Sequence, residues 1–171
     1  TRISEKLGES LSSIQNFNAP LEKTTSSSLE ALKAYSSAGL LNRSGKFLEA
    51  IPLLKHAIEL DPNFASAYSL LARVYQNGRQ PTLAVEAAQK SFALRERVSE
   101  REKLGITYIY YNIVTGEINK GIEVLQLIIQ TYPNDWLAHA NLALQYELIG
   151  QHEKSIEERR EALRLYPNDG P

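Results

Sequence analysis

The 171-residue sequence predicts an all-α fold, a superhelix (α-solenoid) of about four helix-turn-helix repeats preceded by an N-terminal helix. Two observations lead to this prediction. A proline-containing turn recurs with a period of about 34 residues, and a glycine lies half a period before each of these prolines. Helix pairs of this size cannot bury an apolar face alone, so we expect successive pairs to stack.

The recurring turn places a proline between one helix pair and the next. Pro133 and Pro167 are one period apart, and Pro62 precedes Pro133 by two periods and three further positions. Proline ends a helix because it lacks an N–H, and the asparagine after each proline favours a turn. The predicted repeats are therefore 28–64, 65–98, 99–135 and 136–171.

A glycine marks the turn inside most helix pairs. Gly45, Gly116 and Gly150 each precede a closing proline by the same half period, and glycine suits such a turn because it tolerates positive φ. The second repeat has no glycine at this position. We expect the sequence Asn-Gly-Arg-Gln-Pro at 77–81 to form its turn instead.

Two serines are predicted to cap helices. Ser27 followed by Glu30, and Ser99 followed by Glu102, fit the capping-box pattern, in which each side chain bonds to the other residue's backbone N–H. Residues 99–101 are the three that exceed the repeat period. We expect them to lengthen the first helix of the third repeat by about one turn.

Residues 1–27 precede the repeats. Their apolar residues recur at spacings of three and four, at Ile3, Leu7, Leu11, Ile14 and Phe17. This spacing predicts one amphipathic helix. The helix either caps the first repeat or belongs to a linker from an upstream domain.

The composition argues against several function classes. With 19 Lys and Arg against 20 Asp and Glu, the chain lacks the basic excess of a nucleic-acid-binding protein. No apolar stretch is long enough to span a membrane, so we expect no membrane insertion by this fragment. There is no cysteine, and the three histidines lack ligand spacing, so we expect no metal and no cofactor. Phosphate-binding and hydrolase motifs are absent from the sequence, and we expect no catalysis by this fragment.

Over residues 31–169 the pattern resembles the tetratricopeptide repeat family. Small residues there let the two helices of a pair approach closely, and larger residues fill the space between pairs. The third repeat departs most from the family pattern, with Ile109 and Ile128 replacing small residues and Gly121 in an alanine position. Matching positions in the other repeats include Ala38, Ala50, Ala57, Leu71, Ala72, Tyr75, Ala84, Leu142, Ala143, Tyr146 and Ala162.

This resemblance implies that the first helices of successive repeats line a concave groove that binds a protein or an extended peptide. Amide side chains can pair with a peptide backbone, and tyrosines give contact area at low entropic cost. The groove residues implied are Tyr35, Asn42, Arg43, Arg73, Gln76, Asn77, Lys103, Thr107, Tyr110, Asn141, Leu144 and Glu147.

One branch of the family grips the C-terminal carboxylate of a chaperone with lysines and asparagines at fixed positions. Only Lys103 suits that clamp here, because Tyr35, Gly39 and Leu70 occupy its other positions. We therefore do not expect this chain to bind a chaperone tail.

The segment 106–114 is apolar on nearly all sides. Such a helix is either buried on more than one face or exposes a patch for a partner. If a patch is exposed, Tyr110 or Tyr111 is the expected binding hot spot.

Segments 7–14, 28–35 and 98–103 resemble the C-terminal repeat regions of certain bacterial serine/threonine protein kinases, and similar regions occur in winged-helix regulators. A chain that starts at Thr1 and has no methionine agrees with an excised piece of such a parent. The first hypothesis is a non-catalytic protein-interaction module, the accessory or sensor region of a kinase, in the cytoplasm or on the extracytoplasmic side of a membrane-anchored protein. The alternative is a small-ligand-sensing or oligomerisation region of a winged-helix transcriptional regulator, so homo-oligomerisation stays open.

Overall fold

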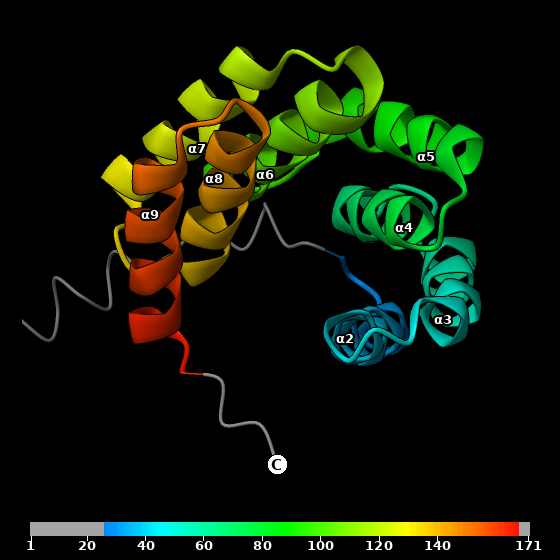
Figure 1. The fold of residues 1–171 in the computed structure, drawn as a ribbon. Coiled ribbons are helices and arrows are strands. Elements are labelled where there is room, and N and C mark those ends of the chain that lie inside the picture. Colours follow the sequence, from blue (N-terminus) through cyan, green and yellow to red (C-terminus); the bar gives the residue numbers. More distant parts are fainter. Residues whose placement is uncertain (1–25, 168–171) are drawn as a thin grey trace, which may run out of the picture.

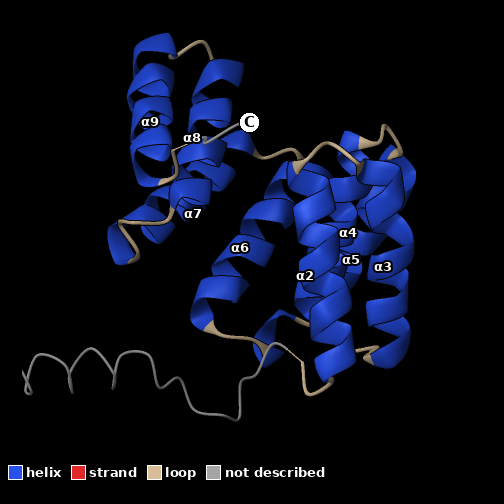
Figure 2. Ribbon diagram, turned by 90° about the horizontal axis from the view of Figure 1, so that it is seen from below, coloured by secondary structure: helices blue, strands red, loops and turns tan. Residues whose placement is uncertain are grey.

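The computed structural model describes residues 26–167, so the helix predicted in the N-terminal segment lies outside the described residues. Within the described part the regular elements are all helical, which confirms the all-α prediction (Figures 1 and 2). The α-helices are α2 (Leu29–Arg43), α3 (Phe47–Leu60), α4 (Ala65–Asn77), α5 (Pro81–Ala93), α6 (Glu100–Tyr110), α7 (Ile118–Thr131), α8 (Trp136–Leu148) and α9 (His152–Leu165).

Consecutive helices of the described part form four antiparallel pairs, α2–α3, α4–α5, α6–α7 and α8–α9. The pairs follow one another around an arc, with α2 at one end and α8–α9 at the other (Figure 1). The first helix of each pair lies on the inner side of the arc and the second on the outer side. This confirms the predicted superhelix of about four repeats.

The turns inside the pairs share one backbone feature. Gly45, Gly116 and Gly150 have φ of 73°, 68° and 74°, as the glycine spacing predicted. In the second pair the residue with positive φ is Arg79, at 58°. Gly78, the residue that ends α4, has an ordinary φ of −80°. The left-handed position of this turn is therefore not occupied by its glycine.

Serine caps begin α2 and α6. Ser99 and Glu102 form the predicted capping box at the start of α6. At α2 the prediction of Ser27 was wrong by one residue. Ser28 is the cap, and its hydroxyl accepts a hydrogen bond of 3.1 Å from the backbone N–H of Ala31. Glu30 therefore lies too close to the cap to complete a box.

The third pair contains the extra residues of the sequence. The α6 helix continues directly into a five-residue π-helical segment, η3 (Tyr111–Thr115), which ends at Gly116. The combined helix is about one turn longer than α4 or α8, as expected. The added length lies at its C-terminal end. The segment 106–114 is buried or half-buried throughout, which confirms the first of its two interpretations.

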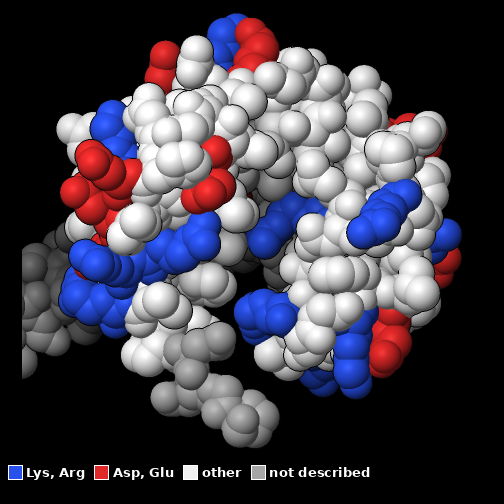
Figure 3. All heavy atoms as spheres, viewed as in Figure 1, with Lys and Arg blue, Asp and Glu red and all other residues white. Residues whose placement is uncertain are grey.

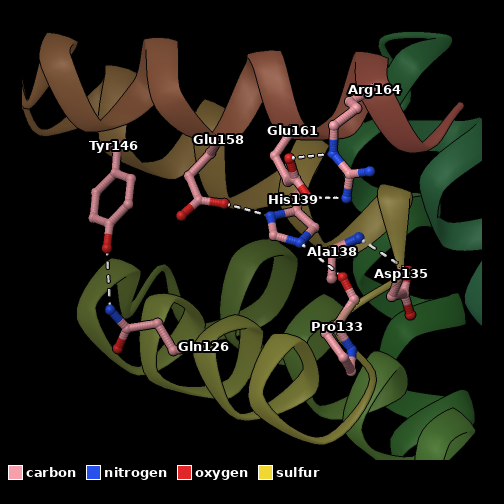
Figure 4. A network of polar contacts seen from close by, with 9 residues as sticks. All are labelled: Gln126, Pro133, Asp135, Ala138, His139, Tyr146, Glu158, Glu161 and Arg164. Atoms are coloured by element: carbon pink, nitrogen blue, oxygen red, sulfur yellow. Dashed lines mark hydrogen bonds and ion pairs between the residues drawn. The ribbon is translucent and has the colours of Figure 1, made fainter. Parts of the chain in front are cut away.

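The core is centred on the second pair, and the last pair is held mainly from one side. Eight residues of α4 are buried, including Leu70 and Val74, whereas α9 buries only Ser155 and Ala162. At this end of the arc, hydrogen bonds between polar side chains add to the small apolar contact of α9. His139 of α8 hydrogen-bonds to Glu158 of α9 at 2.6 Å and to the carbonyl oxygen of Pro133 at 3.2 Å (Figure 4).

Candidate functional site

The inner side of the arc contains a cavity of about 200 Å³. It lies between α2, α4, α6 and α8, with part of α7 behind it. Its lining mixes apolar, hydroxyl, amide and charged side chains: Tyr35, Ser66, Ser69, Leu70, Arg73, Arg101, Glu102, Ile106, Tyr108, Ile109, Leu125, Ile128, Leu137 and Asn141. We call this the inner cavity.

Two tyrosines from different repeats contribute to its wall. The ring of Tyr35 packs on that of Phe64, with 5.0 Å between centroids. The hydroxyl of Tyr108 accepts a hydrogen bond of 3.1 Å from Nε2 of Gln145, a buried amide of α8. Burial raises the pKa of both tyrosines, so both hydroxyls stay protonated at neutral pH and can donate to a ligand.

Arg73 is one of two arginines that line the inner cavity. It lies in the third turn of α4, is half-buried, and forms no ion pair with a described residue. Burial lowers the pKa of Arg73, and the positive charge of Arg43 acts in the same direction. The guanidinium nevertheless stays charged at any physiological pH.

The other arginine of the cavity is already neutralised. Arg101 of α6 forms an ion pair with Asp135, whose carboxylate is mostly buried. Asp135 also caps α8 by accepting a hydrogen bond from the N–H of Ala138. This pair joins α6 to the start of α8, so the charge of Arg101 is already balanced within the fold.

A second cavity of about 490 Å³ opens between the two ends of the arc. Leu40 and Arg43 of α2 form one wall, and Arg159 of α9 contributes to the other. Figure 3 shows Lys and Arg side chains on both sides of this hollow. A stacked pair of rings, Trp136 and Tyr166, also lines it, with 4.7 Å between centroids. We call this the outer cavity.

The structure brings together only part of the predicted groove set. Tyr35, Arg73 and Asn141 line the inner cavity and Arg43 lines the outer one. Each of these residues lies on the first helix of a repeat, on the inner side of the arc.

The remaining groove residues of the first, second and fourth repeats lie outside both cavities. Asn42 and Asn77 join the first two repeats through a 3.3 Å hydrogen bond between their side chains. Gln76 and Leu144 are exposed. The carboxylate of Glu147 accepts a hydrogen bond from Ser155 and pairs with side chains of α9.

Lys103, Thr107 and Tyr110 do not line either cavity. Lys103 pairs with Glu96 at 2.7 Å, and the hydrogen bond between them raises the pKa of Lys103. The hydroxyl of Thr107 donates to the backbone carbonyl of Lys103. The ring of Tyr110 stacks on Phe92 of α5, with 4.0 Å between centroids.

The cavity face of α6 is formed instead by Arg101, Gly105 and Tyr108, each two residues earlier in the chain. Two residues rotate a helix position by about 200°, so the predicted face points nearly the opposite way. The difference comes from counting the third repeat back from its closing proline. The extra residues lie at the end of the helix, and the capping box at Ser99 marks the better starting point.

Residues 26–167 contain no cluster of three or more His, Cys, Asp or Glu that could hold a metal ion. Among these same residues there is no helix of the length and apolarity that a membrane span requires. The polar groups of both cavities can bind a ligand through hydrogen bonds and charge.

Part of the chain matches a known repeat family, and its fold is similar to that of solved structures. Two tetratricopeptide repeat models match it, one at residues 33–64 and one at 53–86. A search of curated proteins finds no match.

Similar solved structures include PilF of Pseudomonas aeruginosa, with 24% identity and a TM-score of 0.55 over 82% of this chain and 63% of that chain. TTC0263, a thermophilic TPR protein in Thermus thermophilus, has 19% identity and a TM-score of 0.54 over 80% of this chain and 74% of that one. At these identities the similarity concerns the fold. Together with the matched repeats, it shows that this chain folds as a tetratricopeptide repeat superhelix.

Proposed function

We propose that the chain is a non-catalytic protein-interaction module that binds an extended segment of a partner protein along the inner side of its arc. The observation that carries the proposal is the inner cavity, where Tyr35, Arg73 and Asn141 come together from three repeats. A surface that combines tyrosine, amide and cationic groups suits a peptide, whose backbone and side chains offer matching partners.

The size and position of the cavities favour an extended segment over a folded domain. The inner cavity, at about 200 Å³, can hold one or two side chains. The outer cavity shares two helices with it, since α2 and α8 contribute to both. A peptide that runs through the hollow would therefore contact the first and last repeats together. Gln76 and Leu144 are exposed and available to contact such a peptide beyond the cavities.

We further propose that the parent is a bacterial serine/threonine protein kinase, for which this chain is the accessory region. The support is the sequence resemblance at 28–35 and 98–103, together with a fold suited to recruiting substrates or regulators. Sequencing the gene upstream of the Thr1 codon tests this. An open reading frame with kinase motifs is expected, and a different catalytic or DNA-binding domain would contradict it.

Peptide binding can be tested with the chain as it stands. A phage library of random 12-residue peptides is panned against the immobilised protein, and recovered peptides are titrated by fluorescence anisotropy. We expect saturable binding by at least one peptide. Amide NMR shifts should then change at Tyr35 and Asn141 and stay constant at Lys90, which is exposed on α5. Failure to recover any binding peptide, or shifts confined to α5, would contradict the proposal.

A further inference from the structure

We infer that the segment bound in the groove is acidic, with an aspartate or glutamate side chain that pairs with Arg73 in the inner cavity. The inference rests on the proposed function and names the chemistry of the partner. One feature carries it: Arg73 lines the inner cavity without an ion-pair partner among the described residues.

The other charged groups of the inner cavity are already engaged within the fold. Arg101 pairs with Asp135. The carboxylate of Glu102 accepts hydrogen bonds from Ser66 at 2.7 Å and from the hydroxyl of Ser99 at 2.8 Å. Arg73 is therefore the cation of this cavity that remains available.

The carboxylate of the same cavity, Glu102, accepts hydrogen bonds from Ser66 and Ser99, and it is not among the groups that shift the pKa of Arg73. The groups whose charges act on it are Tyr108, Tyr35 and Arg43. Burial keeps both tyrosines protonated and neutral, so only Arg43 is charged, and it repels the guanidinium.

Holding a guanidinium half-buried beside a second arginine is unfavourable in the free protein. Burial removes water from the charge, and Arg43 repels it. A ligand carboxylate would offset both effects, because the planar guanidinium can donate two parallel hydrogen bonds to it. Tyr35 and Tyr108 line the same cavity, and their hydroxyls can donate further bonds to a bound anion.

The positive charge of Arg43 favours an acidic ligand in the outer cavity as well as in the inner one. Arg43 is exposed, forms no ion pair with a described residue, and lines the outer cavity opposite α9. Cationic side chains at the border and inside the hollow suit an extended peptide with more than one acidic residue. Figure 3 shows this positive border on a chain whose total charge is only −1.

A nucleic acid fits these features less well than a peptide. Its backbone needs a continuous row of cations, whereas the inner cavity offers a single available arginine among tyrosine, serine and amide groups. Competition by an oligonucleotide is therefore included in the test.

The experiment uses peptides selected from the 12-residue library. We expect Asp and Glu to be enriched in them relative to the unselected library. Arg73→Gln should weaken binding of a selected acidic peptide by about tenfold or more, which is the size of one charge-assisted contact. Arg73→Lys should recover part of the loss, and Arg43→Gln should weaken binding by about threefold. Lys90→Gln removes one exposed positive charge from α5 and should leave the affinity unchanged within about twofold.

Several results would overturn the inference. Selected peptides without acidic enrichment, or full affinity in the Arg73→Gln variant, would mean that Arg73 does not hold an anion. Displacement of the peptide by a 12-nucleotide thymidine oligomer at equal concentration would point to a polyanion site instead. Circular dichroism melting establishes that each variant is folded, and Arg43→Gln, at an exposed position, keeps the test decisive if Arg73→Gln unfolds. Recovery of no peptide at all would instead refute the proposed function.

Discussion

Arg79 occupies the same left-handed backbone position in the second repeat that Gly45 occupies in the first, one full period earlier, with φ of 58° against 73°. A residue with a Cβ is strained there, whereas glycine is not. The turn geometry is thus common to the repeats, and the second repeat maintains it with an unsuitable residue.

Replacing Arg79 by glycine should therefore stabilise the fold. We expect Arg79→Gly to raise the free energy of unfolding by about 1 kcal/mol, the left-handed strain less the added flexibility of the unfolded chain. Urea denaturation followed by circular dichroism measures the change. Gly45→Ala is the matched opposite and should destabilise, since Gly45 has positive φ. A loss of stability in Arg79→Gly would show that the arginine side chain makes a contact that outweighs the strain.

Replacing Gly121 by alanine should also stabilise the fold, for a different reason. It lies inside α7, where glycine costs about 0.5–1 kcal/mol relative to alanine. A Cβ built there would lie 3.7 Å from the ring of Tyr108, an ordinary contact. We expect Gly121→Ala to stabilise by about 0.5 kcal/mol or more, measured by urea denaturation. Gly116→Ala serves as the control, because Gly116 has positive φ and the same change there should destabilise.

The pair of buried His139 and half-buried Glu158 should contribute measurably to the docking of α9. His139 is only 7% exposed, and its Nδ1 lies 2.6 Å from the carboxylate. A double-mutant cycle with His139→Ala and Glu158→Ala should give a coupling free energy of about 1–2 kcal/mol. His152→Ala, at an exposed histidine that pairs with Glu147 at 3.5 Å, should change stability by less than about 0.5 kcal/mol. Coupling near zero would mean that the contact is incidental to the packing of the last pair.

The two cavity tyrosines should make the fold sensitive to alkali. Burial raises the pKa of Tyr35 and Tyr108 in the folded state above the unfolded value of about 10. The folded state then holds these protons more tightly, so their contribution to stability is complete below about pH 10 and is lost as the pH rises through the folded pKa. We expect Tyr35→Phe to flatten the decline above about pH 10, measured by urea denaturation. Tyr132→Phe, at a more exposed tyrosine, should leave the slope unchanged.

The turns and helix starts could be predicted from short sequence patterns, whereas only some of the groove residues could be predicted. The glycine spacing predicted the left-handed turns, and Ser99 with Glu102 predicted the start of α6, because turns and caps are set by a few neighbouring residues.

The groove residues depend on the phase of each helix. Tyr35, Arg73 and Asn141 line the inner cavity, and their helices follow the regular period. Lys103 and Tyr110 line neither cavity, because their positions were counted back from the closing proline, across the extra residues at the end of the helix. A prediction that counts α6 from its capping box would place Arg101 and Tyr108 on the inner face.

By itself the sequence determined that this chain is a stack of helix pairs, since each repeat contains the small residues and the turn residues at the regular spacing. The tertiary structure alone decided which charged side chains form ion pairs across repeats. Asp135 pairs with Arg101 and leaves Arg73 without an ion pair among the described residues, although nothing in the spacing of the two arginines distinguishes them. Such choices depend on which side chains stacking brings within reach across repeats, and that distance is set by packing rather than by sequence separation.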